Sequence, residues 1–262
     1  MYRSEDVNVP IPGGRRIPVR SHWPSQSPLG ALVYFPGGGW VFGDNDGNDV
    51  LARRLALSTG LTVYLVEYSK APEHPFPAAV EDAAGVFEWV ARMESGRPVH
   101  IGGDSAGANL AAVTAIGVRE TGPSLVSQIL MYPPTDADFS RASYGDPVAT
   151  RTVLPAELME WFWAQYVPDA ARRADPRVAP LRTHSLAGLP PTLLITAEHD
   201  ILRDEGELYA QRLAASGVDV THHRFAGQMH GFLSFLDILP AADVAVEAIG
   251  EWTRTRTRRE DT

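Results

Sequence analysis

The sequence predicts an α/β fold in which a mostly parallel central sheet carries helices on both faces. Short apolar runs alternate along the chain with segments of helical periodicity, the pattern of a doubly wound sheet. A chain of 262 residues can bury one large core, and folds of this class commonly form one domain at this length. The alternation is interrupted between residues 134 and 190. We therefore expect a single domain over residues 1–262, with a helical lid inserted over 134–190.

The individual elements follow from hydrophobic spacing and from turn residues. Pro12-Gly13-Gly14 separates two short segments, 7–9 and 16–20, which predicts an antiparallel hairpin. Apolar runs predict further strands over residues 31–35, 61–66, 98–101, 127–132, 192–197 and 218–225. Helical periodicity predicts helices over 48–58, 77–93, 108–116, 155–167, 205–215 and 241–252. Because crossovers between parallel strands are right-handed, the loops that follow the strands meet along one edge of the sheet, where sites form.

The stretch Gly103-Asp104-Ser105-Ala106-Gly107 lies between a predicted strand and a predicted helix that has almost no polar face. A G-x-S-x-G pattern in this context is typical of a nucleophile elbow, a sharp turn that lifts a serine hydroxyl out of the sheet. Glycine is needed on both sides because a side chain there would meet the neighbouring strand or helix. The start of the helix also favours developing negative charge. Ser105 is therefore the candidate nucleophile.

Two later loops supply the groups that a serine nucleophile requires. Asp200 follows the strand 192–197 and His230 follows the strand 218–225, so both are expected at the edge that carries Ser105. In such a set the histidine takes the serine proton during attack, and the aspartate fixes the histidine tautomer and stabilises its cation. The alternatives are His199, His222 and His223 for the base, and Asp204 and Glu198 for the acid.

Each alternative has a simpler explanation. His199 is out of chain order, and His222 and His223 lie within a predicted strand. Asp204 begins a helix, where a capping role explains it, and Glu198 is expected to support the site from behind. The cluster Glu198-His199-Asp200 lacks the helical spacing and the third histidine of a metal site, so we expect no metal.

Composition limits the partners and the compartment. A net charge of −9 argues against nucleic acid or an anionic membrane surface. The absence of cysteine excludes disulfides and a thiol nucleophile. No apolar stretch is long enough to insert into a membrane, and the first residues lack the apolar core of a signal peptide, so we expect a cytoplasmic protein.

Five segments together resemble one family. They are Gly37-Gly38-Gly39-Trp40, the run from Ala71 to Ala79, the run from Gly103 to Leu110, the run from Asp200 to Gly206, and His230-Gly231-Phe232. In this order they are similar to the hormone-sensitive-lipase-like branch of the α/β-hydrolases, the bacterial carboxylesterases, over nearly the whole chain. The resemblance implies the α/β-hydrolase fold and a catalytic triad of Ser105, Asp200 and His230. It further implies an oxyanion hole made by the backbone N–H groups of Gly38, Gly39 and Ala106. The implied activity is hydrolysis of small-molecule esters with short to medium acyl groups, without metal or cofactor.

The sequence departs from the family pattern in two places. Pro36 stands where the family usually has a histidine that supports the glycine loop, and proline has no N–H to donate. The family usually places some 40 residues of helix before the first hairpin, and these form part of the lid. Here the lid is expected to consist of residues 134–190 alone, so that a bulky substrate or a second copy of the chain, in a homodimer, covers the remaining apolar surface.

Three aromatic residues are candidates for contact with substrate: Trp40, Trp161 and Phe232. Trp161 lies off the apolar stripe of the helix predicted over 155–167, on the same face as Glu157 and Gln165.

The motifs do not determine which leaving group the substrate carries. Besides a carboxylesterase, the same residues suit an amidase, a lactonase or a biosynthetic acyltransferase. A non-catalytic small-molecule receptor of this fold is a further alternative. Such receptors typically lose the serine or the histidine, and this chain has both.

Overall fold

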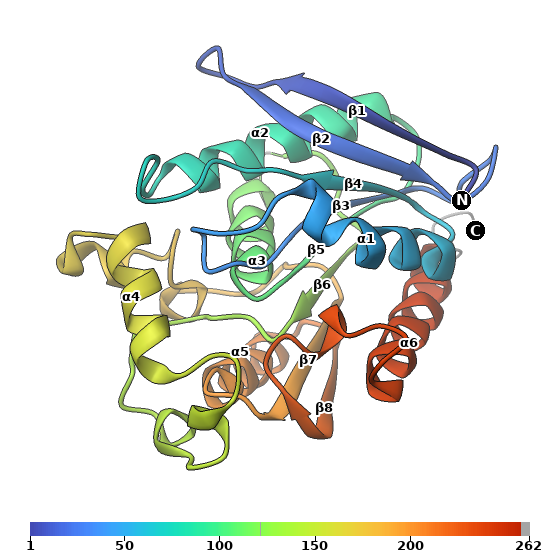
Figure 1. Ribbon diagram of the computed structural model, residues 1–262. Helices are drawn as coiled ribbons and strands as arrows, with labels where there is room; N and C mark the ends of the chain where they lie inside the picture. Colours follow the sequence, from blue (N-terminus) through green and yellow to red (C-terminus); the bar gives the residue numbers. More distant parts are fainter. Residues whose placement is uncertain (121, 258–262) are drawn as a thin grey trace.

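The computed structural model, which describes residues 1–120 and 122–257, is built around a sheet of eight strands (Figure 1). The strands are β1 (Arg3–Pro10), β2 (Arg16–Trp23), β3 (Ala31–Phe35), β4 (Thr62–Val66), β5 (Val99–Asp104), β6 (Ser127–Met131), β7 (Thr192–His199) and β8 (Val220–Met229). Their order across the sheet is β1-β2-β4-β3-β5-β6-β7-β8. β1 pairs antiparallel with β2, β2 pairs antiparallel with β4, and the other five pairings are parallel. The predicted α/β fold with a mostly parallel sheet is confirmed.

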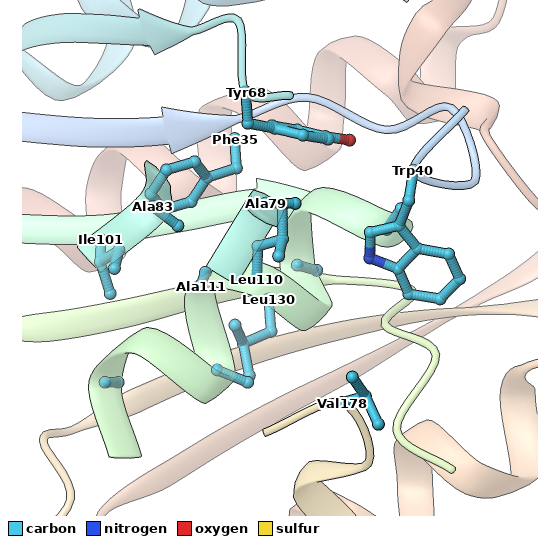
Figure 2. Close-up of a cluster of buried hydrophobic side chains, with 14 of the residues drawn as sticks. Phe35, Trp40, Tyr68, Ala79, Ala83, Ile101, Leu110, Ala111, Leu130 and Val178 are labelled. Carbon is cyan, nitrogen blue, oxygen red and sulfur yellow. The ribbon is translucent and has the colours of Figure 1, made fainter. Parts of the chain in front are cut away.

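The described residues also form six α-helices. They are α1 (Asn45–Thr59), α2 (Ala78–Met93), α3 (Ala106–Val118), α4 (Ala156–Tyr166), α5 (Arg203–Ala215) and α6 (Pro240–Thr257). Helices α1 and α6 cover one face, and α2, α3 and α5 cover the other (Figure 1). Each face has its own apolar core, and Figure 2 shows part of the core around α2 and α3, with Trp40 at its edge on the loop after β3. Because both faces are covered, β3, β4, β5 and β6 are buried at every position instead of alternating between buried and exposed residues.

The segment between β6 and β7 leaves the sheet and carries α4, which stands apart from the other helices (Figure 1). The rest of the segment contains four short 3₁₀ helices: η1 (Ala142–Gly145), η2 (Ala149–Arg151), η3 (Ala170–Ala174) and η4 (Pro180–Arg182). On α4 the side chains of Met159, Phe162, Trp163 and Tyr166 are buried, as the predicted stripe requires. In the described part of the chain, no helix is long and apolar enough to cross a membrane.

The last strand differs from the prediction. The strand was predicted to end at residue 225, with a loop after it, yet β8 continues to Met229. A bulge explains this difference, since the pairing with β7 shifts between Ala197 and His199 and then resumes with His199 opposite Met229. Gly227 lies in this irregular stretch with a φ of +68°. The extension carries the strand up to His230, directly beside the site.

Candidate active site

Ser105 lies on a strained turn between the end of β5 and the start of α3. Its φ of 52° and ψ of −126° are rare for a residue with a side chain. The turn fits only because its neighbours are glycines. A Cβ on Gly107 would lie 1.9 Å from the carbonyl oxygen of Phe35, and one on Gly103 would lie 2.4 Å from the carbonyl carbon of Gly107. The local structure is therefore that of the predicted elbow.

A chain of hydrogen bonds joins the three predicted polar residues. Ser105 Oγ lies 2.9 Å from His230 Nε2, and His230 Nδ1 lies 2.7 Å from Asp200 Oδ2. Because a carboxylate accepts, Nδ1 is the donor in the second bond, which leaves Nε2 free to accept the serine proton. Asp200 is fully buried, and its other oxygen accepts the N–H of Leu202 at 2.9 Å. The histidine is thus held in the tautomer that a general base needs.

The alternative acids and bases are occupied elsewhere. His222 Nε2 lies 2.9 Å from Thr196 Oγ1, and Glu198 Oε2 accepts the N–H of Gly227 at 2.7 Å. Asp204 does not cap its helix as expected, because the helix begins at Arg203 and the N-cap residue is Leu202. The Asp204 carboxylate instead accepts the N–H of Ser143, at 2.8 Å. His199 and His223 form no hydrogen bond to the Ser105–His230–Asp200 chain within the described ranges.

Ser105 and His230 open into a cleft of about 400 Å³. The large apolar residues of its lining come from the loop after β3, from the segment before α4 and from α4 itself: Phe42, Val153, Leu154, Leu158 and Phe162. Asn48 on α1 and Ser234 after His230 add polar groups to the lining. The arrangement offers a nucleophile beside an apolar wall that suits a hydrocarbon group.

The glycine loop after β3 brings backbone N–H groups to the same cleft. Gly38 and Gly39 have φ values of +122° and +60°, which only glycine adopts readily. The N–H of Gly37 donates to Asp104 Oδ1 at 2.9 Å. In the part of the chain that the structure describes, the N–H groups of Gly38 and Gly39 have no acceptor. Together with the N–H of Ala106, which follows the serine, they can serve an anionic oxygen on a substrate.

Comparison with known proteins identifies the family. Residues 32–234 match the family described as alpha/beta hydrolase fold. The carboxylic ester hydrolase LipN of Mycobacterium tuberculosis is 41% identical over 89% of this chain, and the carboxylesterase NlhH of the same organism is 38% identical over 92%. This chain spans 65% of the length of LipN and 78% of NlhH. A solved esterase from Pyrobaculum calidifontis superposes with a TM-score of 0.92 at 41% identity, covering 97% of this chain and 86% of that one.

The chain belongs to the hormone-sensitive-lipase-like branch of the α/β-hydrolases. The relatives are named as carboxylic ester hydrolases and esterases, and this hydrolase has their fold over nearly its whole described length.

The structure shows how the glycine loop of this hydrolase is held although Pro36 replaces the family's histidine. Tyr68 donates its hydroxyl to the carbonyl oxygen of Pro36 at 2.8 Å. Asp104 Oδ1 accepts from both the Gly37 N–H, at 2.9 Å, and the Tyr34 hydroxyl, at 2.6 Å. Burial raises the pKa of Asp104, and these two hydrogen bonds oppose the rise. The loop is therefore fixed through a carbonyl and an N–H that proline at position 36 leaves intact.

Helix α4 supports the same loop from the other side. The ring of Trp40 stacks on that of Tyr166, with centroids 4.5 Å apart and planes at 9°, and lies 5.0 Å from that of Trp163. A Cβ on Gly39 would lie 2.3 Å from the ring of Phe162, so this ring closes over the glycine. The contacts make α4 part of the scaffold of the loop.

The three aromatic residues predicted to contact substrate lie in different environments. Trp40 and Phe232 are fully buried and do not line the cleft. Phe232 packs between Tyr132, 6.0 Å away, and Phe225, 5.1 Å away. Trp161 is 41% exposed and stacks on Phe42 with centroids 6.0 Å apart, and Phe42 does line the cleft. Trp161 does not line the cleft either, and it reaches the site only through its contact with Phe42.

Sequence reasoning did not single out Tyr34, Tyr68 or Asp104 as supports. One signal pointed to Asp104, because it is a carboxylate at the end of a strand that is buried throughout. The tyrosines carried none, since they are 70 and 32 residues from the atoms they contact. Among the described residues there is no group of three or more His, Asp or Glu side chains arranged to hold a metal ion.

Proposed function

We propose that this hydrolase is a serine carboxylesterase that works through an acyl-enzyme. The observation that carries the proposal is the hydrogen-bonded chain from Ser105 Oγ through His230 to buried Asp200, at 2.9 and 2.7 Å. The serine oxygen attacks the ester carbonyl while His230 Nε2 takes its proton, and the resulting imidazolium returns that proton to the leaving alcohol. Water, activated by the same histidine, then releases the acid.

The oxyanion formed in each step is assigned to the N–H groups of Gly38, Gly39 and Ala106. The proposal is supported by the position of Gly38, which lines the cleft together with Ser105, and by that of Ala106, which directly follows Ser105 at the start of α3. It is also supported by the lack of an acceptor for the N–H groups of Gly38 and Gly39 among the described residues. Each such donor contributes about 10²- to 10³-fold to kcat in comparable sites. Because Tyr68 and Asp104 fix the loop beforehand, little reorganisation is needed during the reaction.

The substrate is an ester with a short to medium acyl group. The cleft of about 400 Å³ has one apolar wall, which suits a hydrocarbon chain, but it is too small for a long-chain glyceride. We assign residues 134–190 as the lid of a single domain, because α4 and the segment before it supply Val153, Leu154, Leu158 and Phe162 to this wall. Trp161, stacked on Phe42, is the outermost contact we assign to substrate.

The test is the variant Ser105→Ala together with an active-site label. Wild-type protein should react with a fluorophosphonate probe and hydrolyse p-nitrophenyl esters from acetate to about octanoate, with amides and lactones run beside them. Ser105→Ala should lose labelling and about 10⁴- to 10⁶-fold in kcat while it keeps the folded circular-dichroism spectrum.

The matched control is His199→Ala, because His199 neighbours Asp200 in sequence but is not hydrogen-bonded into the chain of Ser105, His230 and Asp200. It should keep more than half of the activity. Retention of more than a tenth of the activity by Ser105→Ala would remove that residue from its role. If amides or lactones are turned over faster than esters, the protein is an amidase or a lactonase and not a carboxylesterase. If the wild-type protein is not labelled, a non-catalytic receptor is favoured.

A further inference from the structure

One residue of the segment from Asp200 to Gly206 has a conspicuous position that the proposed mechanism does not use. Glu205, in the first turn of α5, is fully buried. A buried carboxyl group is costly unless its partners satisfy it. Arg141, whose charge acts on Glu205, forms its ion pair with Asp136, at 2.9 Å. Glu205 is met by neutral groups instead.

These neutral groups all come from the first part of the insertion between β6 and β7. Glu205 Oε1 accepts the N–H of Thr135 at 2.9 Å, and the backbone carbonyl of Glu205 accepts the Thr135 hydroxyl, also at 2.9 Å. The hydroxyl of Tyr144, on η1, lies 3.4 Å from Glu205 Oε2. One side chain on α5 thus contacts both the beginning of the insertion and its first short helix.

A second set of contacts runs between the same two segments. Ser143 donates its hydroxyl to the carbonyl oxygen of Ile201 at 2.5 Å and its N–H to Asp204 at 2.8 Å. Ile201 directly follows Asp200, whose carboxylate is fixed from the inner side by His230 and by the N–H of Leu202. Hydrogen bonds from residues 135–144 therefore hold the segment that directly follows Asp200.

We propose that Glu205 is a positioning residue for the acid Asp200, holding residues 135–144 of the insertion against the turn that orients that acid. The assignment rests on the proposed function, in which Asp200 orients His230. Loss of the contacts between residues 135–144 and the segment after Asp200 would let Asp200 move relative to His230. Misplacement of a catalytic group by about 1 Å can cost about 10²-fold in rate.

The groups that face Glu205 from the packed segments are Thr135, Asp136, Arg141 and Tyr144. Burial raises the pKa of Glu205 well above its ordinary value, and the Thr135 N–H and Arg141 oppose the rise without cancelling it. The site therefore favours the neutral carboxylic acid more than water does. An amide of the same shape can replace it, with one oxygen to accept from Thr135 and an NH₂ group to donate to Tyr144.

The test compares Glu205→Ala, Glu205→Gln and Ser143→Ala, with kcat expressed per site labelled by fluorophosphonate so that misfolded protein is not counted. Glu205→Ala should lower kcat by about tenfold or more with KM changed less than about threefold. The acid limb of its pH–rate profile should move to lower pH, because a loosened Asp200 stabilises the protonated histidine less. Glu205→Gln should keep kcat within about threefold of wild type, and Ser143→Ala should change kcat and the acid limb in the same direction as Glu205→Ala.

Glu207→Ala is the matched control. Glu207 lies two residues further along α5 and binds Arg224 on β8, not the insertion. It should leave kcat per labelled site within about twofold of wild type. Hydrogen exchange of residues 198–205 should rise in Glu205→Ala and stay unchanged in Glu207→Ala, a readout that does not depend on ester hydrolysis.

Unchanged kcat, acid limb and hydrogen exchange in both Glu205→Ala and Ser143→Ala would overturn the assignment, and so would a Glu205→Gln variant as impaired as Glu205→Ala. If Glu205→Ala does not fold, Ser143→Ala alone decides. Failure of wild-type protein to react with the fluorophosphonate would count against the proposed function instead. Hydrogen exchange of residues 198–205 would then still test whether Glu205 holds the segment around Asp200.

Discussion

The contact between Gly39 and Phe162 makes Gly39→Ala a sharp test of the proposed oxyanion hole. An added Cβ would lie 2.3 to 2.5 Å from three atoms of the Phe162 ring, whereas carbon atoms in contact normally lie about 3.5 to 4.0 Å apart. The loop or the ring must therefore move by about 1 Å or more. The φ of +60° at Gly39 adds strain of about 1 to 2 kcal/mol for any residue with a side chain.

The expected loss follows from these two effects. Displacing one oxyanion donor costs about 10²- to 10³-fold in kcat, or about 2.7 to 4 kcal/mol of transition-state stabilisation. The acyl group binds against the apolar wall and not through the Gly39 N–H, so KM should change less than about threefold. Steady-state kinetics on p-nitrophenyl butyrate, with sites counted by fluorophosphonate, measures both quantities.

Two further variants distinguish the steric clash with Phe162 from the backbone strain of a side chain at positive φ. Gly14→Ala places a side chain at a φ of +82° with nothing within 4 Å, so it should lower stability by about 1 kcal/mol and leave kcat unchanged. Phe162→Ala removes the ring, and adding it to Gly39→Ala should restore kcat at least tenfold relative to Gly39→Ala alone. The reasoning fails if Gly39→Ala keeps more than a third of wild-type kcat, or if removing the ring restores nothing.

The remaining predictions concern the loop support, acid stability and the mouth of the cleft. Pro36→His should change kcat less than about threefold, because the Tyr68 hydroxyl already fixes the Pro36 carbonyl, and a tenfold gain would show that the loop is poorly held. Burial lowers the pKa of His100 to about 3, so the folded state binds fewer protons than the unfolded chain and stability falls as pH drops below about 6.5. By pH 5 the loss should reach about 2 kcal/mol in urea titrations, and His100→Gln should weaken this pH dependence. Trp161→Ala removes the stack on Phe42 and should raise KM for bulky esters more than for acetate. Light scattering on both proteins decides between a monomer and a homodimer and detects any change on substitution.

The parallel sheet and the position of Ser105, Asp200 and His230 could be predicted because each depends on local signals combined with one topological rule. Apolar runs mark the strands, and right-handed crossovers send the loops after them to a common edge. The elbow glycines mark Ser105, and chain order distinguishes Asp200 and His230 from their neighbours. The three side chains accordingly form the hydrogen-bonded chain seen in the structure.

Other features could not be read from the sequence because they depend on side-chain direction or on distant partners. Trp40 and Phe232 follow the glycine and histidine motifs directly, but both point into the core and not into the cleft. The strand was predicted to end at residue 225, although a bulge lets β8 continue to Met229. The contact of Glu205 with Thr135 joins residues 70 positions apart, and no local pattern encodes it.

The aromatic contacts between α4 and the glycine loop limit how this enzyme can be redesigned. An obvious way to alter substrate range is to exchange the insertion between β6 and β7 for that of a relative. In Figure 1 the helix of this insertion, α4, stands apart from the other helices, so the insertion looks separable from the rest of the fold. Tyr166, Trp163 and Phe162 would leave with the exchanged segment, and Trp40 and Gly39 would lose the surfaces they pack on. A chimera that exchanges the insertion without these aromatic contacts would change substrate specificity and kcat together. A successful chimera must carry the glycine loop and its helix as one unit.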